Sequence, residues 1–180
     1  MPGVAGRAGG QTQDVTEQMT QTTPTPASGV AAPRNLHLED IAVGDRFVSG
    51  EHALDADQIK AFAAQYDPQP FHLDETAAES SLFGGLAASG WHTAALTMKL
   101  FVASVPVADG LVGAGVEVSW PKPTRADDIL HTQSTVTEIK PSRSRPGRAM
   151  VTFETLTLNQ DGETRQRLVS RVVMFARGQG

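Results

Sequence analysis

An aspartate and a histidine lie five residues apart in the stretch YDPQPFHLDE, which covers residues 66–75. A carboxylate beside an imidazole can hold a water molecule and move its proton, because histidine titrates near neutral pH. The two prolines of the stretch fix their own φ angles and restrict the residue before each of them. We therefore expect an extended, kinked link that brings Asp67 and His72 to one cleft. The alternative is structural, with Asp67 and Asp74 capping helices and His72 in the core or on the surface.

A run of small residues, Ala87-Ala88-Ser89-Gly90, leads into a long apolar segment. The first turn of a helix has N–H groups without intrahelical partners and a partial positive charge. A glycine at that point leaves its amide open to close approach. We therefore expect the Gly90 amide to form an oxyanion site beside the aspartate and the histidine.

Three helices are predicted to position these groups. The first begins after a predicted N-cap at Asp55 and must end before Pro68, because the residue that precedes a proline is pushed out of the helical region. A short second helix begins near Asp74. The third, from Ala87 to Val105, has one charged residue, so it is predicted to be a buried core helix that is too short to span a bilayer.

Alternating apolar and polar residues predict strands in the rest of the chain. One strand is expected within residues 36–54, and four more near residues 111–120, 129–140, 149–159 and 164–177, the last two joined by a turn at Asp161-Gly162. An antiparallel sheet of about five strands around one long apolar helix is an α+β fold of the hotdog type. Because its edge strands would expose unpaired ladders, we expect a homodimer whose sheets join edge to edge.

The segment YDPQPFHLDETAAESSLFGGLAASGWHTAAL resembles the hydratase motif of the MaoC-like dehydratases, the (R)-specific enoyl-CoA hydratases. Asp67, Pro70 and His72 match the motif in type and spacing. The resemblance spans about Leu36 to Arg177. It implies a hotdog fold, a coenzyme A thioester as substrate, no separate cofactor and no metal. The implied reaction is the reversible addition of water to a trans-2-enoyl thioester, which gives a (3R)-hydroxyacyl thioester.

The resemblance also implies roles for individual residues. Asp67 and His72 would be catalytic, and the Gly90 amide would bind the thioester carbonyl. The remaining substrate-binding residues would include Gln69, Phe71, Ser89 and Trp91. The family usually has an asparagine where this chain has Gln69, an aliphatic residue at Phe71 and a histidine at Ser89. Phe71 and Trp91 add bulk, so a narrowed acyl pocket for short or unusual chains is expected.

An arginine-rich loop, PSRSRPGR, follows the predicted strand at residues 129–140. Arg143 and Arg145 would contact the phosphates of coenzyme A, because a guanidinium group matches phosphate geometry, or else the loop is a solvated turn. Two other functions stay open, an acyl-thioester thioesterase and a non-catalytic acyl-CoA-binding module. A serine hydrolase is disfavoured because no G-x-S-x-G motif is present.

The composition sets the outer limits. The chain of 180 residues has a net charge of −5 and no cysteine, which argues against a nucleic-acid groove and excludes disulfides and thiolate metal sites. Residues 1–34 are rich in Gly, Thr, Gln, Ala and Pro, so we expect a flexible, dispensable tail before a single domain at residues 35–180. With no apolar signal sequence or membrane span, a cytoplasmic location is expected.

Overall fold

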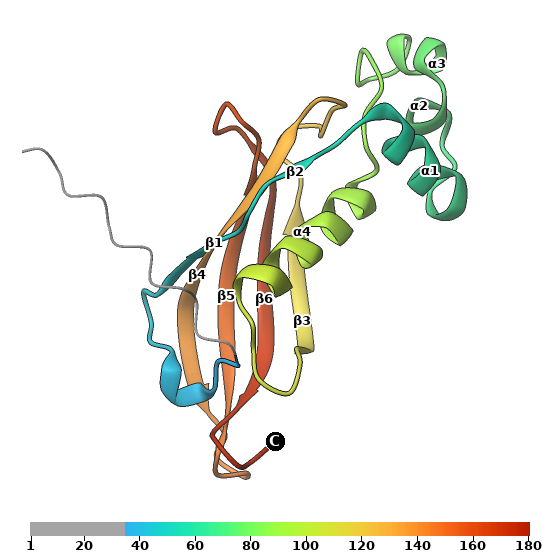
Figure 1. The fold of residues 1–180 in the computed structure, drawn as a ribbon. Helices are drawn as coiled ribbons and strands as arrows, with labels where there is room; N and C mark the ends of the chain where they lie inside the picture. Colours follow the sequence, from blue (N-terminus) through green and yellow to red (C-terminus); the bar gives the residue numbers. More distant parts are fainter. Residues whose placement is uncertain (1–34) are drawn as a thin grey trace, which may run out of the picture. The chain divides into compact units, whose positions relative to one another are not determined.

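The computed structural model describes residues 35–180, in which one antiparallel sheet carries one long helix (Figure 1). The strands follow the order β1-β4-β5-β6-β3, and β2 pairs with the start of β4. Their bounds are β1 Arg46–Val48, β2 His52–Ala53, β3 Val112–Ser119, β4 Ile129–Pro141, β5 Arg148–Leu158 and β6 Thr164–Phe175. The predicted hotdog arrangement is confirmed. Six strands replace the expected five because the first predicted strand is divided into two short ones.

The β5–β6 hairpin lies where the sequence places it. Thr164 of β6 pairs with Leu158 of β5. Gly162 has φ +74°, a left-handed conformation that glycine adopts without a steric penalty. Along β5 and β6, buried and partly exposed residues alternate, so one face of the sheet is directed toward the helix.

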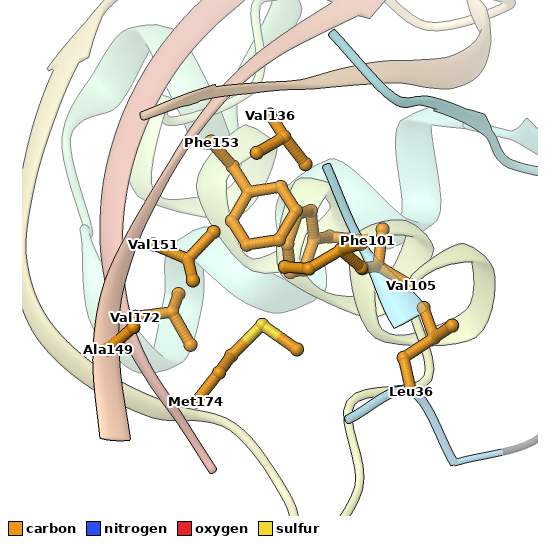
Figure 2. Close-up of a cluster of buried hydrophobic side chains, with 10 residues drawn as sticks. Leu36, Phe101, Val105, Val136, Ala149, Val151, Phe153, Val172 and Met174 are labelled. Atoms are coloured by element: carbon orange, nitrogen blue, oxygen red, sulfur yellow. The ribbon is translucent and has the colours of Figure 1, made fainter. Parts of the chain in front are cut away.

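The long helix α4, Gly90–Ser104, packs on the inner face of the sheet. At its C-terminal half Phe101 meets Phe153 of β5 edge to face, with ring centroids 5.2 Å apart, and both side chains are buried (Figure 2). Burying a side chain of this size contributes about 1.5–3 kcal/mol. The members of this core are Leu36, Ile41, Phe101, Val105, Val136, Ala149, Val151, Phe153, Val172 and Met174.

The prediction that this helix starts at Ala87 is wrong by three residues. Ala87 and Ala88 lie outside the helix, because the carbonyl of Ala87 accepts a hydrogen bond from His72 and the amide of Ala88 donates one to Thr124. Ser89 is the N-cap, and its side chain accepts a hydrogen bond from the amide of Trp91. These external partners replace the bonds that a further helical turn would supply.

Three short helices precede α4 at one end of the sheet: α1 Ala56–Tyr66, α2 Pro70–Leu73 and α3 Glu75–Glu79. Asp55 caps α1 and Asp74 caps α3, as their positions predict. The prediction that the whole link between Asp67 and Asp74 is extended is wrong, because residues 70–73 form the helical turn α2. Only the part up to Gln69 is extended, because Pro70 at the first helical position favours a helical turn that carries His72.

The prediction of a flexible tail at residues 1–34 lies outside the described residues. A short 3-10 helix, Leu38–Asp40, precedes β1. Within residues 35–180, no helix has both the length and the apolar character that a bilayer span requires.

Candidate active site

Asp67 lies at the C-cap of α1, and three polar groups surround its carboxylate. Oδ2 accepts a hydrogen bond of 2.6 Å from Oγ of Ser89, and Oδ1 accepts one of 2.8 Å from Nε2 of Gln69. The hydroxyl of Ser89 lowers the pKa of Asp67 most, with smaller contributions from Gln69 and the charge of His72, while burial opposes them. Asp67 is therefore a carboxylate at neutral pH.

The environment of His72 selects one tautomer of its neutral ring. Its Nδ1 lies 2.7 Å from the carbonyl oxygen of Ala87. A carbonyl can only accept, so Nδ1 carries the proton and Nε2 of the neutral ring has a free lone pair. Nε2 lies 3.5 Å from Oδ2 of Asp67, and the His72 ring is buried. An imidazole nitrogen and a carboxylate thus face each other, as the spacing of the two residues predicts.

The N-terminus of α4 completes the group. Ser89 is fully buried, donates to Asp67 and accepts from the amide of Trp91, so it holds the carboxylate and caps the helix at once. Gly90 is the first helical residue, and residues 35–180 offer its amide no hydrogen-bond acceptor. A Cβ at Gly90 would lie 2.7 Å from the indole of Trp120, so the position requires glycine.

Asp67, Gln69, His72 and Gly90 line a cavity of about 420 Å³ and contribute polar groups to it. Its other lining residues are Phe71, Phe83, Ala88, Trp91, Thr93, Trp120, Pro121, Lys122, Pro123 and Thr124. Of the predicted substrate-binding residues, Gln69, Phe71 and Trp91 line this cavity. Ser89 does not line it and instead positions Asp67.

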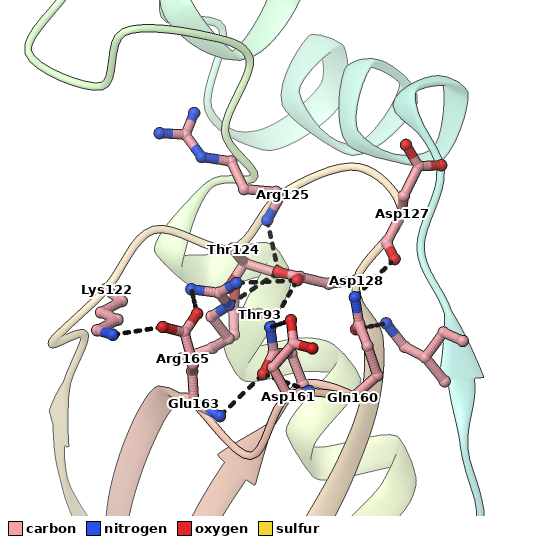
Figure 3. A network of polar contacts seen from close by, with 12 residues as sticks. Thr93, Lys122, Thr124, Arg125, Asp127, Asp128, Gln160, Asp161, Glu163 and Arg165 are labelled. Carbon is pink, nitrogen blue, oxygen red and sulfur yellow. Dashed lines mark hydrogen bonds and ion pairs between the residues drawn. The ribbon is translucent and has the colours of Figure 1, made fainter.

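The segment between β3 and β4 forms one wall of the cavity, and sequence reasoning gave it no role. Trp120 covers Gly90, and its Nε1 donates to Oε1 of Gln166, 2.7 Å away. Asp128 holds the end of this segment through two hydrogen bonds of 2.9 Å from Arg165 (Figure 3). The Pro-Lys-Pro break at residues 121–123 was the only sequence signal that this segment leaves the sheet.

Arg143 and Arg145 lie at the opposite end of the sheet. They line a separate depression in the β4–β5 hairpin, whereas the cavity adjoins the segment just before β4. The 13 residues of β4 separate the two regions, about 40 Å at 3.3 Å per residue. Within one subunit the β4–β5 hairpin is directed away from the N-terminus of α4, so Arg143 and Arg145 do not adjoin the cavity of their own subunit. Contact with a partner subunit's substrate stays a prediction.

His92, two residues into α4, is a packing residue in this structure. Its ring stacks on Phe62 of α1, with centroids 4.6 Å apart and planes 4° apart, and it does not line the cavity. Burial, and then the nearby His52, lower the pKa of His92, so its ring is neutral at pH 7. Within residues 35–180 no cluster of histidine, aspartate and glutamate side chains is suited to a metal ion.

Comparisons with known proteins show the family and the fold. A solved MaoC-like dehydratase from Rhodospirillum rubrum is 61% identical, with a TM-score of 0.78 over 79% of this chain and 99% of that one. The (R)-hydratase from A. caviae, described as involved in PHA biosynthesis, is 25% identical, with a TM-score of 0.61 over 76% and 98% of the two chains.

Two curated proteins also align. The uncharacterized protein YdeM of Bacillus subtilis is 32% identical over 67% of this chain and 86% of its own length. A 3-hydroxybutyryl-CoA dehydratase of Methylorubrum extorquens is 29% identical over 62% and 71% of the two lengths. The model of the MaoC like domain matches residues 37–157, which is about two thirds of the sequence. The chain therefore belongs to the MaoC-like dehydratase family.

Proposed function

We propose that the protein is a hydro-lyase that reversibly adds water to a trans-2-enoyl thioester and gives a (3R)-hydroxyacyl thioester. The observation that carries the proposal is the placement of His72, whose Nε2 lies 3.5 Å from the carboxylate of Asp67 while its Nδ1 lies 2.7 Å from the carbonyl oxygen of Ala87. Both groups accept hydrogen bonds, so a water molecule can donate one proton to each.

The reaction follows from this arrangement. His72 Nε2 takes a proton from the water, whose oxygen forms a bond to C3 of the enoyl chain. The electron pair of the C2–C3 double bond moves toward the thioester carbonyl as an enolate. The Asp67 carboxylate stabilises the imidazolium formed at His72. The proton then returns to C2, so one molecule of water is added and the pair is regenerated.

Gly90 supplies the stabilisation of the enolate oxygen. Its amide is an unpartnered N–H of the first turn of α4, and the residue lines the cavity beside the pair. The positive end of the helix dipole adds to the attraction. Removing one donor of this kind from an oxyanion site costs about 10²–10³ in rate.

The substrate is proposed to be a coenzyme A thioester with a short acyl chain, and no separate cofactor is needed. The relative named 3-hydroxybutyryl-CoA dehydratase supports the thioester class, and the (R)-hydratase supports the (3R) stereochemistry. Phe71, Phe83, Trp91 and Trp120 line the cavity of about 420 Å³. Four large aromatic side chains leave limited room for a long chain, which favours short acyl groups.

The assembly is proposed to be a homodimer. β3 is an edge strand of the sheet and exposes Val112 and Val116. The helix α4 exposes Trp91, Met98 and Val102, which share one side of the helix because they are seven and four residues apart. An unpaired strand edge and an exposed apolar helix face are both suited to a second copy of the chain. The cavity lining includes Trp91, so the site would adjoin this interface.

The test is a spectroscopic assay of the purified protein with crotonyl-CoA and longer 2-enoyl-CoA esters. Loss of the enoyl-thioester absorbance, with (3R)-3-hydroxyacyl-CoA on chiral analysis, is the expected result. Release of free coenzyme A would instead indicate a thioesterase. Saturable binding of every ester without product would indicate an acyl-CoA-binding module, and either outcome would overturn the proposal.

A further inference from the structure

The loop between α3 and α4 converges on a single side chain. The guanidinium of Arg125 donates through Nη1 to the carbonyls of Gly85, at 2.7 Å, and Leu86, at 3.0 Å, and through Nη2 to that of Phe83. Gly84 and Gly85 have φ angles of +59° and +150°, which few other residues adopt. The loop is thus folded so that three carbonyl oxygens point at one cation.

Arg125 itself is firmly held. Its backbone amide donates to Oδ2 of Asp128, 2.8 Å away, and Asp128 is buried. The same carboxylate accepts two hydrogen bonds from Arg165 of β6 and one from Asn159 (Figure 3). The guanidinium of Arg125 has several donors in a rigid plane. Because the backbone of Arg125 is held in place, these donors hold the loop in one geometry.

The anchored loop continues directly into the candidate active site. Leu86 precedes Ala87, whose carbonyl accepts the Nδ1 proton of His72. The amide of Ala88 donates to the carbonyl of Thr124, the residue before Arg125, at 2.9 Å. Four hydrogen bonds therefore join residues 83–88 to residues 124–125. Ala87, whose carbonyl selects the tautomer of His72, lies within the first of these segments.

We propose that Arg125 is a positioning residue of the site. It fixes the Ala87 carbonyl, and through it the Nδ1–H tautomer of His72 and the position of Nε2 opposite Asp67. It also sets the place of Phe83, whose ring lies 5.1 Å from that of Phe71 in the cavity wall. The catalytic consequence rests on the proposed hydratase function, whereas the effect on the His72 tautomer does not.

A first experiment measures the tautomer directly. Nitrogen chemical shifts of histidine in ¹⁵N-labelled protein are recorded for the wild type, Arg125→Ala and Arg125→Lys. His72→Gln identifies the signals of His72. We expect a pure Nδ1–H tautomer in the wild type and a mixture in Arg125→Ala. Arg125→Lys keeps the charge and is the variant to use if Arg125→Ala does not fold. An unchanged tautomer in a folded Arg125 variant would overturn the proposal.

A second experiment measures turnover. Arg125→Ala is expected to lower kcat for crotonyl-CoA hydration by about 10²-fold, the scale of an ångström-level misplacement of a catalytic group. Addition of guanidinium ion at non-denaturing concentration should restore part of kcat. Arg177→Ala, which removes an exposed ion pair with Asp40 and lies outside the cavity lining, is the matched control and should keep full activity. Full activity in Arg125→Ala would contradict the catalytic role. A wild type without any turnover would instead overturn the proposed function and leave the tautomer measurement as the test.

Discussion

Replacing Ser89 by alanine tests how the helix N-terminus and the carboxylate are coupled. The change removes the 2.6 Å hydrogen bond to Asp67 and the cap that accepts from the amide of Trp91. A hydrogen bond to a charged group contributes about 1.5–3 kcal/mol, and an N-cap about 1 kcal/mol. Asp67 keeps the bond from Gln69 and is partly exposed to water. We therefore expect Ser89→Ala to lower the free energy of unfolding by about 2.5 kcal/mol at pH 7.

The loss should depend on pH in a defined direction. The hydroxyl of Ser89 is the largest cause of the lowered pKa of Asp67. A depressed carboxyl pKa stabilises the fold above the ordinary value of about 3.9, and this contribution disappears as pH falls through the folded-state pKa. The stability difference between wild type and Ser89→Ala should therefore shrink in acid. The acidic limb of the activity profile should move to higher pH in the variant.

Denaturant unfolding at several pH values measures these effects. A double-mutant cycle with Ser89→Ala and Asp67→Asn isolates the coupling of the pair. Asp55→Ala, which removes the N-cap of α1 outside the cavity, is the activity control and should lose stability but keep kcat. Ser89→Ala should lower kcat by about 10²-fold, since Asp67 loses its positioning contact. Additive stability effects within about 0.5 kcal/mol would show that Ser89 and Asp67 do not interact, and would refute this reasoning.

Three further predictions follow from the packing around the site. Gly90→Ala would place a Cβ 2.7 Å from the indole of Trp120, so the free energy of unfolding should fall by about 1–3 kcal/mol and the hydration rate should fall sharply. A variant with wild-type stability and activity would show that the indole moves away without cost. Asp128→Ala would leave the buried Arg165 with only the partly exposed carboxylate of Glu163 and should cost about 3 kcal/mol in denaturant unfolding, whereas a loss below about 1 kcal/mol would mean that Glu163 and water replace the partner. Val102→Glu should convert the proposed dimer into a monomer in sedimentation measurements, and a wild type that is itself an active monomer would contradict the interface.

The fold was predictable where one local signal dominated. Alternating residues predicted β4, β5 and β6, and aspartates at N-cap positions predicted the starts of α1 and α3. The approach of Asp67 and His72 was predictable from their spacing and the two prolines between them, although the link was expected to be extended and His72 lies in a helical turn. The apolar character of α4 likewise predicted its burial.

The remaining features depend on tertiary contacts that no local pattern encodes. The start of α4 is set by bonds from Ala87 and Ala88 to residues far along the chain. Arg125 gave no signal, because its partners are backbone carbonyls that any residue would supply. The position of Arg143 and Arg145 was not predictable from their charge, because charge does not reveal which end of a strand a loop occupies, and their contact with a substrate stays a prediction.

The measurement that tests the central claim most directly is the rate of crotonyl-CoA hydration by the wild type, Asp67→Asn and His72→Ala, with folding of each verified by circular dichroism. General acid–base catalysis typically contributes 10²–10⁴-fold, so each variant should lose about that factor in kcat. Such losses in folded proteins would support the assignment of the carboxylate and the imidazole as one catalytic unit. Folded variants that hydrate the substrate at the wild-type rate would contradict it.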